Sequence, residues 1–105
     1  MNKSEIAQFE LDMLELLKNV MDPEIEINIV DLGLIYELYY DGDKKINIVM
    51  TFSTPACPLG DTIKTNIEET IKQKYTDFTV NIDVVFHPAW NTSMVSEEGK
   101  RVLGL

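Results

Sequence analysis

Hydrophobic residues near the N-terminus recur at alternating spacings of three and four, which places them on one face of a helix. These residues are Ile6, Phe9, Met13, Leu16 and Val20. The spacing predicts an amphipathic helix over residues 4–20, with Ser4 as its N-cap. Asp22-Pro23 ends the predicted helix, because the residue before a proline disfavours α geometry.

A period of two replaces the helical period after a loop over residues 22–33. Residues 34–40 are rich in β-branched and aromatic side chains and predict a strand, which the turn Asp41-Gly42-Asp43-Lys44 joins to a second strand. One face of the second strand carries Ile46, Ile48, Met50 and Phe52, and the other carries Asn47, Val49, Thr51 and Ser53.

The second half of the chain predicts a helix, a strand and an irregular tail. Pro58 suits the first turn of the helix, and Ile63, Ile67 and Ile71 recur every fourth residue until about Tyr75. Residues 78–86 alternate as a strand, and residues 93–103 could hold a short helix. Strands with one apolar face and two amphipathic helices predict an α/β (α+β) two-layer sandwich, in which the helices cover one side of a small sheet.

Composition limits the class of protein. The 105 residues suffice for one domain, residues 1–105, and are too few for two. A net charge of −9 would repel a phosphate backbone, so no nucleic-acid partner is expected. No apolar run is long enough for a membrane span, and the N-terminus lacks a secretion signal, so we expect a cytoplasmic protein. The single cysteine agrees with a reducing compartment.

Cys57 is the main candidate for chemistry. It lies near the start of the second predicted helix, where the helix dipole and free backbone N–H groups favour a thiolate, the form that ligates metals. A small buried cysteine that packs a strand-to-helix turn is the other interpretation, and both stay open. Hydrolase chemistry is disfavoured, because no known cysteine-hydrolase signature surrounds Cys57.

Other residues in loops could contribute to a site around Cys57. They are Asp22, Glu24, Asp31, His87 and Trp90. Asp22 and Asp31 could equally be turn formers whose side chains bond backbone amides two residues on. One cysteine and His87 cannot close a four-ligand metal site within one chain, although a homodimer could bring two of each together. Trp90 could either cap the core or anchor an interface.

Separated motifs, taken in order, carry a resemblance to a known family. They are Asp22-Pro23-Glu24, residues 30–36, Met50-Thr51 with residues 54–59, and Pro88, Trp90, Met94 and residues 96–101 with Leu103-Gly104. Together they resemble the SufT/PaaD-type domain of iron–sulfur cluster assembly, over nearly the whole chain. The resemblance implies a fold akin to the C-terminal domain of NifU. It places the family's cysteine on Cys57, its acidic loop positions on Asp22, Glu24 and Asp31, and its tryptophan on Trp90.

The resemblance also implies a function. We expect a non-enzymatic accessory factor whose partners are the iron–sulfur assembly machinery and client apoproteins, with Cys57 as candidate ligand of iron or a transient cluster. A monomer is not expected to hold a cluster tightly, since thiolate-ligated clusters usually take four cysteines. Members of the family commonly carry Asp-Pro-Pro-Trp where this chain has His87-Pro88-Ala89-Trp90, which leaves the role of His87 open.

Two alternatives to this function remain. One is a PaaD-like accessory of a phenylacetyl-CoA oxygenase, which would be expected to carry a further cysteine-rich C-terminal segment, whereas this sequence ends at Leu105 without one. The other is a plain protein-interaction module with a buried, inert cysteine.

Overall fold

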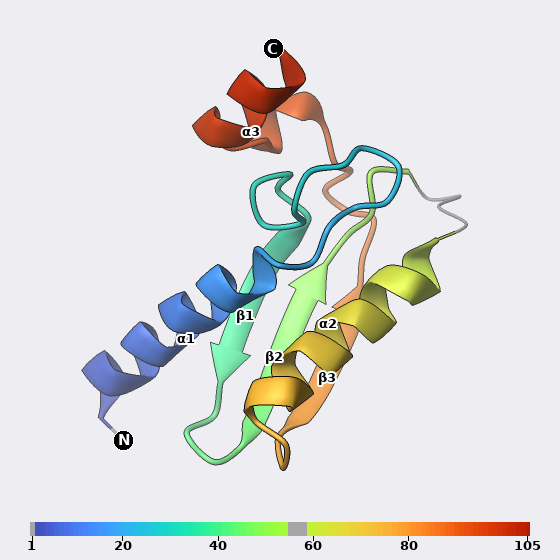
Figure 1. Ribbon diagram of the computed structural model, residues 1–105. Coiled ribbons are helices and arrows are strands. Elements are labelled where there is room, and N and C mark those ends of the chain that lie inside the picture. Colours follow the sequence, from blue (N-terminus) through green and yellow to red (C-terminus); the bar gives the residue numbers. More distant parts are fainter. Residues whose placement is uncertain (1, 55–58) are drawn as a thin grey trace.

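The elements of the chain follow the predicted order in a computed structural model that describes residues 2–54 and 59–105. They are α1 (Lys3–Leu17), β1 (Ile35–Tyr40), β2 (Lys45–Met50), α2 (Gly60–Lys74), β3 (Thr79–Val84), the 3-10 helix η1 (Thr92–Met94) and α3 (Glu97–Leu103). Helices α1 and α2 lie on the same side of a three-stranded sheet, and α3 lies beyond one end of it (Figure 1). The predicted α+β two-layer arrangement is therefore confirmed.

The strand order, which the sequence pattern did not predict, is β1-β2-β3. Strands β1 and β2 form an antiparallel hairpin, and its turn places Gly42 and Lys44 at positive φ. Strands β2 and β3 are parallel, with Ile48 opposite Ile82. Parallel neighbours need a long crossover connection, which α2 supplies. As a consequence, β2 and β3 end side by side at the same end of the sheet.

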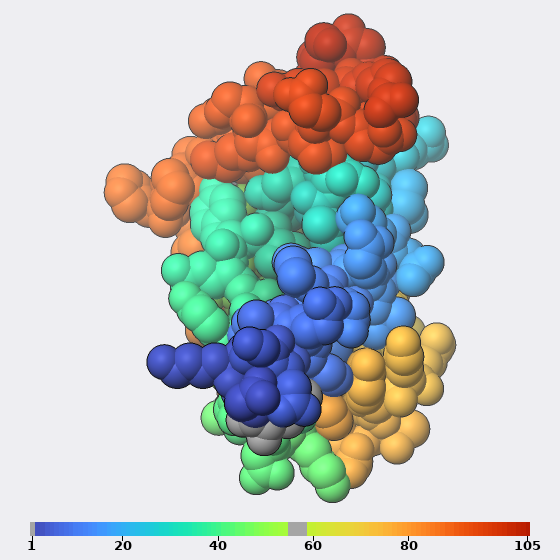
Figure 2. Space-filling view, turned by 90° about the vertical axis from the view of Figure 1, so that its left-hand side faces the viewer, coloured from blue at the N-terminus to red at the C-terminus, as the bar shows by residue number. Residues whose placement is uncertain are grey.

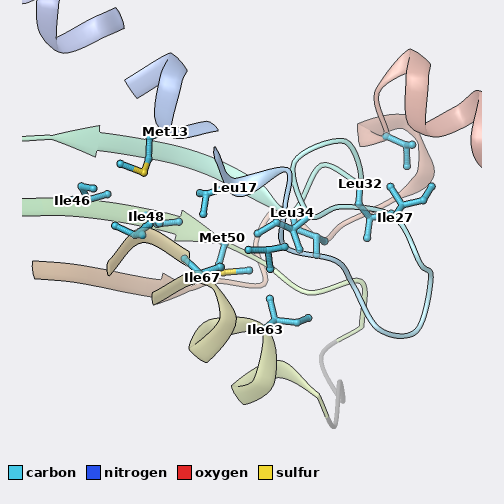
Figure 3. Packing of buried hydrophobic residues seen from close by; sticks show 14 residues of the cluster. Met13, Leu17, Ile27, Leu32, Leu34, Ile46, Ile48, Met50, Ile63 and Ile67 are labelled. Atoms are coloured by element: carbon cyan, nitrogen blue, oxygen red, sulfur yellow. The ribbon is translucent and has the colours of Figure 1, made fainter. Parts of the chain in front are cut away.

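The core lies between the sheet and the two long helices. The alternating residues Ile46, Ile48 and Met50 of β2 are fully buried, as the period of two predicts. Ile63 and Ile67 of α2 and Met13 and Leu17 of α1 pack against them from the helical layer (Figure 3). Ile71, one turn further along α2, is buried in the same cluster. The apolar faces predicted for these elements are thus the faces that fold inward.

The boundaries of α1 differ from the prediction at both ends. Asn2, rather than Ser4, is the N-cap: its side chain accepts a hydrogen bond from the Glu5 N–H, and the Glu5 carboxylate accepts one from the Asn2 N–H. The helix ends at Leu17 instead of continuing to residue 20. Beyond it the carbonyl of Val20 accepts the N–H of Ile29 at 2.9 Å, so pairing with the following loop buries Val20 outside the helix.

Later boundaries also shift. Helix α2 begins at Gly60 rather than at Pro58, which lies outside the described residues together with Cys57. Strand β3 is shorter than the predicted residues 78–86. The predicted C-terminal helix is divided, because Val95 has extended backbone between η1 and α3. Across residues 2–54 and 59–105, the helices are too short or too polar to cross a lipid bilayer.

Candidate functional site

The loops that carry the predicted site residues gather at one end of the molecule, which we call the site end. It comprises the C-terminal ends of the parallel strands β2 and β3, the first turn of α2, the loop of residues 21–34 and the segment of residues 85–96 (Figure 1). In open sheets with parallel strands, ligands commonly bind at this end of the strands. Cys57 lies outside the described residues, between Thr54 and Leu59 on the chain.

Asp22 begins the loop as a turn former. Its side chain is 2% exposed, and its Oδ1 accepts the backbone N–H groups of Glu24 at 2.8 Å and Ile25 at 3.1 Å. The Asp22 N–H also donates to the carbonyl of Ile27. This is the turn that the sequence predicts for Asp22. Glu24 itself is exposed, so its carboxylate lies on the surface of the loop.

Asp31 connects the loop to the C-terminal helix, whereas one of its two interpretations from the sequence was a local turn former. Asn28 makes that local turn, since its Oδ1 accepts the N–H groups of Val30 and Asp31. The Asp31 carboxylate instead accepts the Asn28 amide at 2.7 Å and the Ser96 hydroxyl at 2.8 Å. The Asp31 carbonyl also accepts the Ser96 N–H at 2.7 Å. The interpretation of Asp31 as a local turn former is therefore wrong, because the folded chain brings the Ser96 hydroxyl to its carboxylate.

These hydrogen bonds set the charge state of Asp31. The amide of Asn28 stabilises the ionised carboxylate and lowers its pKa below the ordinary value; burial opposes the shift, and the Ser96 hydroxyl and the charge of Lys18 assist it. Ser96 in turn is the N-cap of α3, since its Oγ accepts the Gly99 N–H at 3.0 Å. The ionised carboxylate thus holds α3 through a hydroxyl that also caps it.

Further contacts hold the segment after β3 against the same loop. The Trp90 indole N–H donates to the Leu32 carbonyl at 2.7 Å, and its partly buried ring packs on the core. Gly33 has φ +84°, and a Cβ there would lie 2.2 Å from the Met94 carbonyl oxygen. Figure 2 shows the C-terminal segment lying directly on the loop. Trp90 therefore covers the core, which is one of its two predicted roles.

His87 lies apart from these contacts. Its side chain is exposed and borders a hollow of about 700 Å³ on the uncovered side of the sheet, together with Tyr36, Val49 and Met94. The Tyr36 hydroxyl donates to the Pro88 carbonyl at 2.7 Å and fixes the chain beside His87. Asp31 and Trp90 thus both make hydrogen bonds in the loop of residues 21–34, whereas His87 lies on the other side of the sheet.

The donors in the described part of the chain do not form a metal site on their own. Among those residues, no three His, Asp or Glu side chains are close enough to share a metal ion. Helix α2 offers a different feature: its N-cap, Leu59, makes no side-chain capping bond. Among the described residues, no side chain caps the N–H groups of this first turn, and such groups favour negative charge nearby.

The sequence interpretation missed three residues that position this end. Asn28 and Ser96 hold Asp31, and Tyr36 holds the backbone at Pro88. A signal existed for Ser96, because serine followed by two glutamates is a typical helix start. No comparable signal identifies Tyr36, whose partner lies 52 residues away.

Residues 10–84 match the sequence family described as iron–sulfur cluster assembly protein. An Fe-S protein maturation auxiliary factor of Porphyromonas gingivalis is 38% identical, and the match covers 96% of each chain. The auxiliary factor YitW of Bacillus subtilis is 30% identical over 85% of this chain and 87% of its own. A solved domain from Bacillus anthracis has a TM-score of 0.93 and 28% identity, over 99% of both chains. These similarities extend from α1 to the C-terminal segment.

Proposed function

The chain belongs to the iron–sulfur cluster assembly protein family, and on that premise we propose that it is an auxiliary factor in the maturation of iron–sulfur proteins. The observation that carries this proposal is the similarity to a maturation auxiliary factor over 96% of both chains. In this role the chain catalyses no turnover of a small molecule. It works in the reducing cytoplasm, where a single cysteine stays a thiol, and it docks to the assembly machinery and to client apoproteins.

Cys57 is the residue that we assign to the cargo, which is iron or a transiently held cluster. In sequence it lies two residues before Leu59, the N-cap of a helix whose first turn has no side-chain cap. Backbone N–H groups without an acceptor stabilise a nearby thiolate, and a thiolate is the usual protein ligand of iron–sulfur clusters. Because one cysteine supplies only one of the usual four ligands, thiols of the partner protein complete the set and make the contact transient.

The remaining site residues shape the surface on which partners dock. Asp22, Asp31 and Trp90 hold the loop of residues 21–34 in place through buried or half-buried hydrogen bonds. Glu24 and His87 are exposed at the surface and are available to a partner. The rigidity of this frame supports docking, because a preformed surface loses little conformational entropy on binding.

Replacement of the cysteine tests the proposal. In cells whose own copy is deleted, Cys57→Ser is expected to leave client iron–sulfur enzymes with few clusters, measured by their iron content and activity. Thr65→Ser, an exposed change in the second turn of α2 and outside the site end, is the matched control and should restore the clients fully. Circular dichroism of both variants checks that the domain still folds. Full client maturation with Cys57→Ser would refute the role of Cys57 as a ligand of the cargo, but it would not refute the docking role of the loops.

Alkylation of the native protein distinguishes an active thiol from an inert one. We expect iodoacetamide to label Cys57 within minutes at neutral pH, because a thiolate near a helix N-terminus reacts faster than an ordinary thiol. The denatured protein provides the reference rate. Complete protection of the native thiol would instead support a plain interaction module with a buried cysteine.

A further inference from the structure

Strand β3 is an outer strand of the sheet, and within the described part of the chain no strand lies beside one of its edges. The N–H of Thr79 donates to Lys44 and that of Val85 donates to Met50, both at 2.8 Å, so odd-numbered residues turn their polar backbone groups toward β2. Since these groups alternate along a strand, those of Val80, Ile82 and Val84 point away from β2. No group within residues 2–54 or 59–105 pairs with the outward N–H groups.

The two outer strands of the sheet differ in how their edges are protected. Strand β1 has a register irregularity between Ile35 and Glu37, and the Glu10 carboxylate accepts the Tyr40 N–H at 2.9 Å. Strand β3 has regular pairing throughout, and its sequence, TVNIDV, contains no lysine or proline. Proteins usually block pairing at an edge with bulges, prolines and charged side chains, lysine above all. Asp83 is the one charged residue of β3, so its edge is blocked only against strands that place another acidic residue opposite Asp83.

We propose that β3 pairs with β3 of a second copy of this chain, antiparallel about a two-fold axis at Ile82. In this register the outward N–H and C=O groups of Val80 meet those of Val84 of the second copy, and Ile82 meets its own equivalent. All outward backbone groups of β3 are then paired. The two sheets become one continuous sheet of twice the number of strands.

Side-chain complementarity is the reason to choose a second copy as the occupant. Directly opposite residues share a face, so exposed Asn81 lies opposite Asp83 of the second copy, and the symmetry repeats the pair. The Asn81 amide donates one hydrogen to the Asn47 Oδ1 at 3.2 Å and can donate its second hydrogen to a carboxylate, and the two Asp83 side chains do not oppose each other. On the other face, half-buried Val80, Ile82 and Val84 meet one another as β-branched cross-strand pairs, which are favourable.

The proposed dimer also determines where the two site ends lie relative to each other. A two-fold axis through antiparallel β3 strands sends the C-terminal ends of the strands in opposite directions. The two site ends therefore lie at opposite ends of the joined sheet, and each copy binds its partner independently. The interface does not rest on the proposed role of Cys57, so the two proposals fail separately.

A charge exchange across the interface tests the proposed register. Asn81→Asp places two carboxylates opposite each other twice in the dimer and should weaken self-association about tenfold in sedimentation equilibrium. Asp83→Asn alone leaves neutral amides in the pair and should still associate. The double variant Asn81→Asp/Asp83→Asn restores an amide opposite a carboxylate and should recover the affinity. Both positions are exposed, and the melting temperature of each variant checks its fold.

Hydrogen exchange provides a second readout. The amides of Val80, Ile82 and Val84 should become protected as the protein concentration is raised, while the amide of Tyr39 on β1 serves as an internal reference. A chain that stays monomeric up to about 1 mM, where even weak specific pairs form, would overturn the proposal. Equal association of all variants would overturn the register. Protection of these amides only on addition of a client protein would assign the edge to that partner instead.

Discussion

Replacement of Ser96 by alanine should loosen α3 from the loop that carries Asp31. The Ser96 hydroxyl donates to the Asp31 carboxylate at 2.8 Å and accepts the Gly99 N–H at 3.0 Å, so the change removes an N-cap and a charge-assisted hydrogen bond together. Loss of an N-cap costs about 1 kcal/mol. The hydrogen bond to a charged group adds about 1.5 kcal/mol, at the low end of its range because both partners are only half-buried.

The total of about 2.5 kcal/mol corresponds to roughly 70-fold more frequent local opening of α3. Native-state hydrogen exchange measures this opening directly, at the amides of Lys100 and Leu105, which bond within the last turns of the chain. The amide of Ile48 in β2 should exchange with little change, because the core does not depend on α3.

Two variants control for the substitution itself. Ser96→Thr keeps an oxygen at the same position and should retain most of the protection. Ser93→Ala removes an exposed hydroxyl whose hydrogen bond within the described residues goes to Asn91, so α3 should exchange as in the wild type. Unchanged exchange at Lys100 in Ser96→Ala would refute the reasoning, because it would mean that the bond to Asp31 does not hold the helix.

The remaining predictions concern the same contact between loop and tail. The pKa of Asp31 in the folded protein lies below its unfolded value of about 3.8. The stability that the ionised carboxylate contributes is therefore fully present above that pH and is lost as the pH falls through the folded pKa. Protection of α3 should therefore fall below about pH 4 in the wild type but stay flat in Asp31→Asn, and a parallel fall in both would contradict this. Gly33→Ala should lower the free energy of unfolding by about 3 kcal/mol or more, since it combines a positive φ with a clash against Met94. Gly42→Ala, which has a positive φ without a clash under 3.4 Å, should cost about 1 kcal/mol in the same urea titration.

Much of the fold could be predicted because its signals are local. The alternation of Ile46, Ile48 and Met50 and the fourfold spacing of Ile63 and Ile67 each depend only on the period of the element that carries them. Those side chains are the buried ones in the structure. The turn at Asp22 was predictable for the same reason, since its carboxylate reaches amides two and three residues away.

The site was less predictable because its contacts join distant parts of the chain. Asp31 and Ser96 are 65 residues apart, and Trp90 and Leu32 are 58 residues apart. Nothing in the residues next to Asp31 indicates that its carboxylate accepts the hydroxyl of a helix N-cap instead of a nearby backbone N–H. The motifs containing Asp31, Trp90 and Ser96 stood together in the family resemblance, although each motif alone gave no reason for that association.

The sequence by itself determined the order of the elements, their inward faces and the family, because these depend on local periodicity and on motifs in fixed order. Only the tertiary structure decided where α1 stops, which strand edge stays open and what Asp31 binds. Helix α1 ends at Leu17 because Val20 pairs with Ile29, and β3 has a free edge because the crossover through α2 places it outermost. Such contacts exist only after the chain has folded, when residues far apart in sequence compete for the same hydrogen-bonding groups.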